Sequence, residues 1–179
     1  MKILAISGSL RVTSSNTAVV NAVKAMAPAG VEVAVFGGLA DLPPFNPDDD
    51  GETVPTPVVD LRSRIEGADA VLISSPEYAH GVPGVLKNAL DWLVGGAEIV
   101  GKPIALINAA PRATHAHASL TETLTVMSAR VIQAASITVG LTGRNLDASG
   151  IVADAELSSA LRSAIVALVR ASESHNEAA

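Results

Sequence analysis

Short, mainly apolar runs alternate with longer amphipathic stretches along the chain, and this alternation limits the folds it can adopt. Residues 3–6 and 103–107 have the length and apolar character of strands buried on both faces. Between such runs, apolar residues recur at helical spacing, as at Val19, Val23 and Met26. Five strands alternating with five helices indicate a parallel sheet with helices on both faces. We predict strands at residues 3–6, 31–35, 68–73, 103–107 and 131–139, and helices around residues 19–27, 58–65, 86–94, 120–127 and 157–168.

The turn after the first predicted strand decides between the two common strand orders of such sheets. Right-handed crossovers reduce the topologies to a doubly wound sandwich. The dinucleotide-binding order carries G-x-G-x-x-G at this turn, whereas residues 8–16 contain a single glycine. We therefore predict a flavodoxin-like three-layer α/β/α sandwich, with a five-stranded parallel sheet in the order 2-1-3-4-5. Its ligand site is expected at the carboxyl ends of the strands, in the loops at residues 7–16, 74–83 and 108–114.

The composition fits one globular domain. The 179 residues are 49% hydrophobic and 17% charged, a balance that supplies a core and argues against disorder. We predict a single domain over residues 1–171 and a C-terminal tail, residues 172–179, that frays. The apolar run at residues 1–6 is too short for a signal sequence or a membrane span, so we expect a cytoplasmic protein.

The scarcity of some residue types disfavours several functional classes. Aromatic residues make up only 2%, so a module that stacks nucleic-acid bases on aromatic rings is not expected. The net charge of −6 disfavours nucleic acid and anionic membranes as partners. Cysteine is absent, which excludes disulfides and thiol nucleophiles. The acidic triplet at residues 48–50 is expected to be a solvated charge run rather than a metal site, since no ligands follow at EF-hand spacing. We predict no metal.

The first candidate loop combines hydroxyl groups with one arginine. Backbone N–H groups at the start of the next helix point into the same space, where the helix dipole favours an anion. The loop therefore favours a phosphate monoester, with a serine-rich cap of a ligand-free helix as the alternative. Its polar side chains are those of Ser9, Arg11, Thr13, Ser14, Ser15 and Asn16.

The second candidate loop runs from Ser75 to Gly84 and contains two prolines and two glycines. These residues stiffen the loop and let its backbone approach a flat ligand. Tyr78 lies in the loop rather than on a core face, which favours a ligand contact. Glu77 is either a general base or a solvated or backbone-capping carboxylate. His80 is a candidate acid or base, with a bystander role as the alternative.

Two motifs carry a family resemblance. The first is Gly8-Ser9-Leu10-Arg11-x-x-Ser14-x-Asn16. The second is Pro76-Glu77-Tyr78-x-x-x-x-Pro83-Gly84-x-Leu86-Lys87-Asn88-Ala89-Leu90-Asp91-Trp92. Together they resemble the NAD(P)H-dependent FMN reductases of the flavodoxin-like superfamily, the branch that includes bacterial quinone, chromate and azo-dye reductases. The strand pattern extends the resemblance over residues 1–171.

The resemblance implies a role for each residue of these motifs. The FMN phosphate would contact the side chains of Ser9, Arg11, Ser14 and Asn16, and the backbone at Leu10, Ser15 and Thr17. The isoalloxazine ring would lie against Pro76, Glu77, Tyr78 and Ala79, with His80 and Gly81 at its edge and Ala110 nearby. Structural or interface positions would be Lys87, Asn88, Asp91 and Trp92.

The chain departs from the family pattern in two loops. Family members often have Asn after the Tyr, where this chain has Ala79. The loop at residues 108–115 lacks the glycines that are frequent there. Arg112, His115 and His117 in this stretch either shape the pocket for NAD(P)H or the acceptor, or are exposed residues at a helix start.

The resemblance also implies the reaction. A hydride would pass from NADPH or NADH to N5 of FMN, and two electrons would then pass to a quinone or similar small acceptor. No catalytic side chain is required apart from the candidate His80, because the cofactor carries the chemistry. Backbone groups at residues 78–81 would donate to the N1–C2=O edge of the flavin.

Two other readings of the sequence are a flavodoxin-type electron carrier and a non-enzymatic FMN-binding protein. The moderate net charge and the presence of Arg11 favour the reductase over the carrier. The family resemblance further implies a homodimer or homotetramer, with Leu93 and Val94 as candidate interface residues. The physiological acceptor and the preference between NADH and NADPH stay open.

Overall fold

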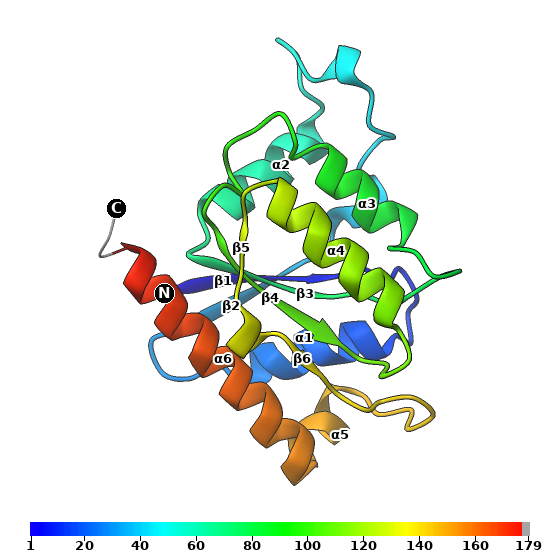
Figure 1. The fold of residues 1–179 in the computed structure, drawn as a ribbon, viewed down its shortest axis with the longest axis vertical. Helices are drawn as coiled ribbons and strands as arrows, with labels where there is room; N and C mark the ends of the chain where they lie inside the picture. Colours follow the sequence, from blue (N-terminus) through cyan, green and yellow to red (C-terminus); the bar gives the residue numbers. More distant parts are fainter. Residues whose placement is uncertain (177–179) are drawn as a thin grey trace.

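In the computed structural model, which describes residues 1–176, parallel strands form a single sheet (Figure 1). The sheet order is β2-β1-β3-β4-β5, and β6 pairs with β4 beyond β5. This order confirms the predicted flavodoxin-like arrangement. The strands are β1 (Lys2–Ser7), β2 (Glu32–Phe36), β3 (Ala70–Ser74), β4 (Pro103–Asn108), β5 (Arg130–Val131) and β6 (Ile137–Thr138).

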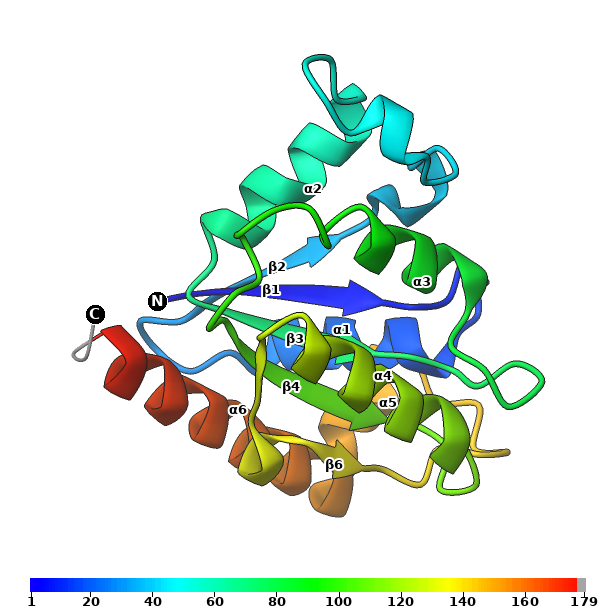
Figure 2. The same cartoon turned by 45° about the horizontal axis from the view of Figure 1, so that its top comes forward.

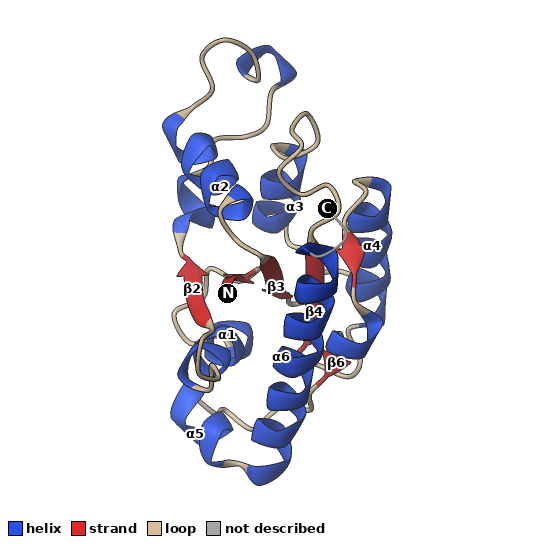
Figure 3. Cartoon of the chain, turned by 90° about the vertical axis from the view of Figure 1, so that its left-hand side faces the viewer, coloured by secondary structure: helices blue, strands red, loops and turns tan. Residues whose placement is uncertain are grey.

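Helices cover both faces of the sheet (Figure 3), and alternate side chains along each strand enter opposite helical layers. Ile3 and Ala5 of β1 pack with α1, α5 and α6, whereas Leu4 and Ile6 pack with α2, α3 and α4. Both faces of the sheet are therefore covered, which explains why the strands read as continuous apolar runs. The helices are α1 (Ser15–Ala25), α2 (Thr56–Glu66), α3 (Gly84–Asp91), α4 (Thr114–Val126), α5 (Ala148–Ala153) and α6 (Ala155–Asn176).

The predicted fifth strand at residues 131–139 is wrong in extent, because a short 3-10 turn (Gln133–Ala135) divides it into β5 and β6. At the break, the Ser136 hydroxyl accepts a hydrogen bond from Leu106 N and donates to Ile132 O, each at 3.0 Å. A side chain thus replaces a backbone partner in the ladder. The apolar pattern correctly indicated a buried segment here, but it did not indicate the break in the strand beside Ser136.

The ends of two helices differ from expectation. Helix α2 begins at Thr56, before the predicted start at residue 58, and Pro55 is its cap, without a side-chain hydrogen bond among the described residues. Helix α6 continues past Ala171 to Asn176. Ser172 is buried, and its hydroxyl donates to Asp69 O at 3.0 Å, which holds the helix beside the sheet where we expected fraying. Residues 177–179 of the expected tail lie outside the described residues. Over residues 1–176, no helix has the length and apolarity needed to cross a membrane.

The segment between β2 and α2 is anchored by the motif helix α3 and the turn that follows it. Pro43 O accepts hydrogen bonds from Asn88 Nδ2 at 2.9 Å and from Trp92 Nε1 at 2.8 Å. Asn88 Oδ1 accepts from Phe45 N at 2.7 Å, and the Phe45 ring meets the buried Trp92 ring edge-on at 5.0 Å between centroids. Asn88 and Trp92 are therefore structural residues. Leu93, the neighbour of Trp92, is buried as well.

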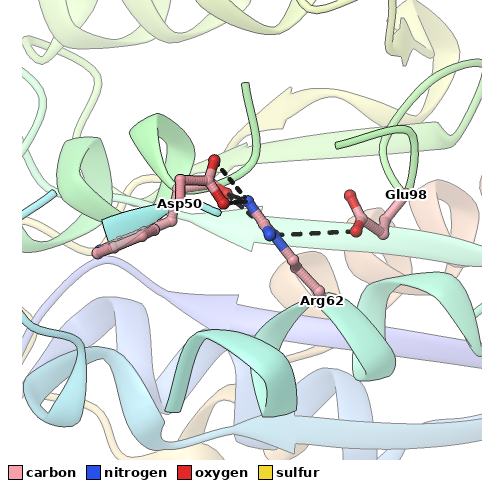
Figure 4. Close-up of polar contacts among 4 residues, drawn as sticks. Asp50, Arg62 and Glu98 are labelled. Carbon is pink, nitrogen blue, oxygen red and sulfur yellow. Dashed lines mark hydrogen bonds and ion pairs between the residues drawn. The ribbon is translucent and has the colours of Figure 1, made fainter. Parts of the chain in front are cut away.

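Arg62 of α2 forms ion pairs with Asp50 of the same segment and with Glu98 (Figure 4). Its Nη2 lies 2.8 Å from Asp50 Oδ1, its Nε lies 3.8 Å from Glu98 Oε1, and its Nε also donates to Trp92 O at 3.1 Å. Asp50 is half-buried in this network, so the expectation of a solvated acidic run holds for Asp48 and Asp49 only.

Candidate functional site

The loops that follow β1, β3 and β4 gather at one edge of the sheet because these strands run in the same direction (Figure 2). They enclose a cavity of about 260 Å³ at the switch point between β1 and β3, the place where a sheet of this order binds ligands. The cavity is lined by Ser9, Arg11, Thr13, Ser14, Ser15, Asn16, Ser75, Pro76, Glu77, Tyr78, Ala109, Ala110, Ala113, Thr142 and Asn145.

Nine of the fourteen predicted site residues line this cavity: Ser9, Arg11, Ser14, Ser15, Asn16, Pro76, Glu77, Tyr78 and Ala110. Thr17 instead lines a neighbouring hollow of about 510 Å³ beside α5. Leu10, Ala79, His80 and Gly81 line neither space, and the Leu10 side chain is exposed to solvent. Sequence reasoning missed Thr142 and Asn145, which follow β6. The only signal for them was that the carboxyl ends of all parallel strands share one edge.

The first loop is shaped by serine hydroxyls. Ser14 is the N-cap of α1, and its Oγ accepts hydrogen bonds from Asn16 N at 3.2 Å and Thr17 N at 3.4 Å. Ser9 Oγ accepts from Arg11 N at 3.3 Å. Ser14 therefore caps α1 and also lines the cavity, so both roles considered for this loop are present. The N-terminus of α1 lies at the cavity wall, where its N–H groups favour an anion.

Asn16 has a second role that its sequence position did not reveal. Its Oδ1 accepts a hydrogen bond of 2.9 Å from the fully buried hydroxyl of Ser74 at the end of β3. Gly8 N also donates to Ser74 O at 2.8 Å. Ser74 therefore ties the first loop to the strand from which the second loop starts, and fixes the spacing between them.

The second loop contains a tight two-residue turn. Tyr78 N donates to Gly81 O at 3.1 Å, and Gly81 N donates to Tyr78 O at 2.9 Å. The two central residues, Ala79 and His80, have φ of 49° and 60°. Positive φ at both central positions is characteristic of a type I′ turn, which favours Asn and Gly. The frequent Asn of the family pattern at position 79 thus has a conformational reason, and Ala79 adopts this conformation at a cost.

The turn also changes which backbone groups are free to bind a ligand. We expected donors from residues 78–81, but Tyr78 N and Gly81 N are used within the turn. Within residues 1–176, the N–H groups of Ala79 and His80 have no backbone or side-chain acceptor. Any donation from the turn to a ligand therefore comes from its two central residues.

Two contacts join the second loop to α4. Glu77 Oε2 accepts a hydrogen bond of 2.8 Å from Ala116 N in the first turn of the helix. The rings of His80 and His115 stack with centroids 4.2 Å apart and planes 12° from parallel. Of the alternatives for Glu77, the backbone-capping role is the one observed.

The third loop is closed by a buried asparagine. Asn108 Oδ1 accepts from Ala110 N at 3.0 Å, and Asn108 Nδ2 donates to Ala113 O at 3.1 Å. Ala110 lines the cavity as expected, but its N–H is engaged and offers nothing to a ligand.

The charged residues of this region differ in burial. Arg11, Arg112 and His115 are exposed, whereas His117 is partly buried beside a small internal cavity. Burial lowers the pKa of the His117 imidazole from its ordinary value, so the ring is neutral near pH 7. His117 therefore adds no positive charge to the site, and Arg11 is the cation of the cavity lining.

The donor set matches a ligand with a phosphate at one end and a flat ring at the other. The end suited to a phosphate is formed by the N-terminus of α1, four hydroxyl-bearing residues and Arg11. Pro76, Tyr78 and small residues of the third loop form the other wall. FMN has this combination of groups, so the residues present fit it.

Comparisons with known proteins agree with this fit. The model of a family described as NADPH-dependent FMN reductase matches residues 1–143. The NAD(P)H-dependent FMN reductase PA1204 of Pseudomonas aeruginosa is 31% identical over 159 residues, 86% of this chain and 85% of that protein. A quinone reductase of Escherichia coli K12 is 38% identical over 107 residues, 58% of this chain. The chain spans only 57% of the length of that quinone reductase.

Solved structures show the same relationship. FerB, a flavoenzyme NAD(P)H:(acceptor) oxidoreductase from Paracoccus denitrificans, aligns with a TM-score of 0.78 and 29% identity over 97% of this chain and 98% of that one. Oxidised flavodoxin 1 from Bacillus cereus aligns with a TM-score of 0.60 at 18% identity, over 95% of this chain and 98% of that one, a likeness that concerns the fold alone.

Proposed function

Because the chain belongs to the family of NADPH-dependent FMN reductases, we propose that it holds FMN in the 260 Å³ cavity and reduces a small acceptor with electrons from NADPH or NADH. FMN, when bound, supplies the two-electron chemistry. The protein supplies binding, orientation and a boundary against water.

One observation carries the proposal: the N-terminus of α1, Arg11 and the Pro76–Tyr78 stretch line one cavity although they come from loops far apart in sequence. The guanidinium group of Arg11 offers a positive charge and a planar set of donors suited to a phosphate. Backbone N–H groups of α1 add a preformed positive potential. These residues would hold the phosphate group.

At the other end, the turn at residues 78–81 would border the flavin ring. The N–H groups of Ala79 and His80 are the donors that the turn leaves free, as judged over residues 1–176. Donors fixed by a turn stabilise developing negative charge without having to reorganise. The half-exposed Tyr78 side chain leaves one wall of the site open to a second substrate.

A quinone or a similar small molecule is the acceptor that the relatives support. The Escherichia coli relative is named a quinone reductase, and FerB is named an NAD(P)H:(acceptor) oxidoreductase. The open wall of the cavity suits an acceptor that enters after the nicotinamide leaves.

We also propose that the protein is a homo-oligomer. The side chains of Val94, Val100 and Val126 are 64%, 55% and 74% exposed, and these residues line one hollow of about 490 Å³ beside α4. Exposed apolar side chains that gather in one place mark interaction surfaces. Val94 is therefore a candidate interface residue together with Val100 and Val126, and the buried Leu93 lines the same hollow.

The test is reconstitution with FMN followed by anaerobic titration with NADPH and with NADH. We expect a yellow protein whose visible absorption bleaches with at least one of the two, and which turns over with a quinone acceptor. Arg11→Met should weaken FMN binding, whereas Arg64→Met, which removes an exposed arginine paired with Asp60 on α2, should not. A protein that binds FMN but is bleached by neither nucleotide would be a carrier or a non-enzymatic FMN protein, and would overturn the proposal.

A further inference from the structure

The turn at residues 78–81 is strained, and its conformation needs support from outside. Ala79 and His80 both lie in the left-handed region, which costs residues with a β-carbon free energy. Two mutual hydrogen bonds between Tyr78 and Gly81 close the turn but do not fix its place against the rest of the molecule. Strained backbone persists where surrounding contacts determine it.

Helix α4 lacks a cap from its own sequence. Ala113 occupies the N-cap position and makes no side-chain cap bond among the described residues. The Glu77 carboxylate supplies that acceptor from 39 residues away, at 2.8 Å from Ala116 N. It also places a negative charge at the positive end of the helix dipole. The stacked rings of His80 and His115 give a second contact between the same two elements.

We propose that Glu77 is a positioning residue, which holds the strained turn against α4 and so fixes the free N–H groups of Ala79 and His80 before any ligand binds. Glu77 lines the cavity and immediately precedes Tyr78, the first residue of the turn. Its Oε2 accepts from Ala116 N, and this bond ties the residue that precedes the turn to α4. The consequence for flavin binding rests on the proposed function, but the mechanical link between turn and helix does not.

Two substitutions at Glu77 separate the hydrogen bond from the charge. Glu77→Gln keeps an oxygen that can accept from Ala116 N, whereas Glu77→Ala removes it. In FMN-free protein, we expect Glu77→Ala to raise the hydrogen-exchange rate of the Tyr78 and Gly81 amides by roughly five- to ten-fold, the size of a lost helix cap. Glu77→Gln should stay within about three-fold of the wild type, and His115→Ala should give an intermediate increase.

The second readout is the dissociation constant for FMN, measured by quenching of flavin fluorescence. It should rise by roughly five- to ten-fold in Glu77→Ala and be restored by Gln. Unchanged exchange of amides in β1 and β3 shows that the variants are folded. Exchange at Tyr78 and Gly81 that is equal in wild type and Glu77→Ala would overturn the positioning role. If the wild type does not bind FMN tightly, the proposed function is overturned, but the hydrogen-exchange result still tests the positioning role of Glu77.

Discussion

Substitution of Ala79 tests the strained turn directly. Ala79 has a φ of 49°, a conformation that costs a residue with a β-carbon about 1–2 kcal/mol. Asn is several-fold enriched there among non-glycine residues, which corresponds to about 0.6–1 kcal/mol. Ala79 is exposed, so the larger side chain meets no packing penalty. We expect Ala79→Asn to stabilise the protein by about 0.5–1 kcal/mol.

The magnitude can be read from thermal unfolding. For a chain of this length, 1 kcal/mol corresponds to about 2–4 °C in Tm, so Ala79→Asn should raise Tm by about 1–4 °C. Ala79→Gly relieves the strain of about 1–2 kcal/mol but loses about 0.5–1 kcal/mol through the greater freedom of the unfolded chain, so a gain similar to that of Ala79→Asn is expected. Ala79→Val should lower Tm by several degrees, because a β-branched residue is a conformational outlier at positive φ.

An order of Tm in which Asn and Gly both lie above Ala, and Ala lies above Val, is specific to a left-handed position. In an extended conformation Val would rank above Gly, since β-branched residues favour extended backbone and glycine carries an entropic cost. Scanning calorimetry on the four FMN-free proteins gives the order. A Tm of Ala79→Val at or above that of the wild type would refute the assignment of strain to this turn.

Three further outcomes follow from other parts of the structure. Arg62→Met leaves the half-buried carboxylates of Asp50 and Glu98 facing each other, so it should cost about 2–4 kcal/mol in urea unfolding while FMN affinity stays unchanged. Arg11→Met should weaken FMN binding by about ten- to a hundred-fold but leave riboflavin binding unaffected, since only FMN carries the phosphate. Equal losses of affinity for both ligands would contradict the phosphate role of Arg11. Burial lowers the pKa of His117 in the folded protein below the ordinary value of about 6.5. The unfolded chain therefore binds more protons below pH 6.5, so the contribution of His117 to stability is fully present above this pH and is lost as the pH falls below it. His117→Gln should therefore lose less stability than the wild type between pH 7.5 and 5.5 in urea titrations, and identical losses would contradict the assigned burial.

The sheet order was predictable from residues 1–16 and the strand pattern. A single glycine after β1 argued against the dinucleotide-binding order, and the structure has β2-β1-β3-β4-β5. The five predicted helices and the first four strands were located, because each buries a periodic apolar face that local sequence displays. Helices α4 and α6 extend beyond their predicted bounds, and the short helix α5 was not predicted. The split of β5 and β6 was not predictable, because Ser136 bonds Leu106 thirty residues away.

The candidate site was predictable in its residue types but not in their partners. The two motifs identified Ser9, Ser14 and Tyr78 as site residues, and all three line the cavity. The motifs left open whether Glu77 was a base or a cap, because its partner Ala116 lies on another element. They also gave no sign that Asn16 bonds Ser74 across 58 residues.

The sequence by itself determined the alternation of strands and helices, the absence of thiol chemistry and the two loops that carry polar groups, since composition and short-range periodicity are local properties. Only the tertiary structure decided which of those groups remain free. Ala110 N is engaged by Asn108, Tyr78 N by Gly81 and Glu77 by Ala116, and each of these bonds uses a group that the sequence offered to a ligand. The physical reason is that an unpaired buried donor or acceptor costs free energy, and the folded backbone decides which partner each group finds, whether in the same loop or on another element.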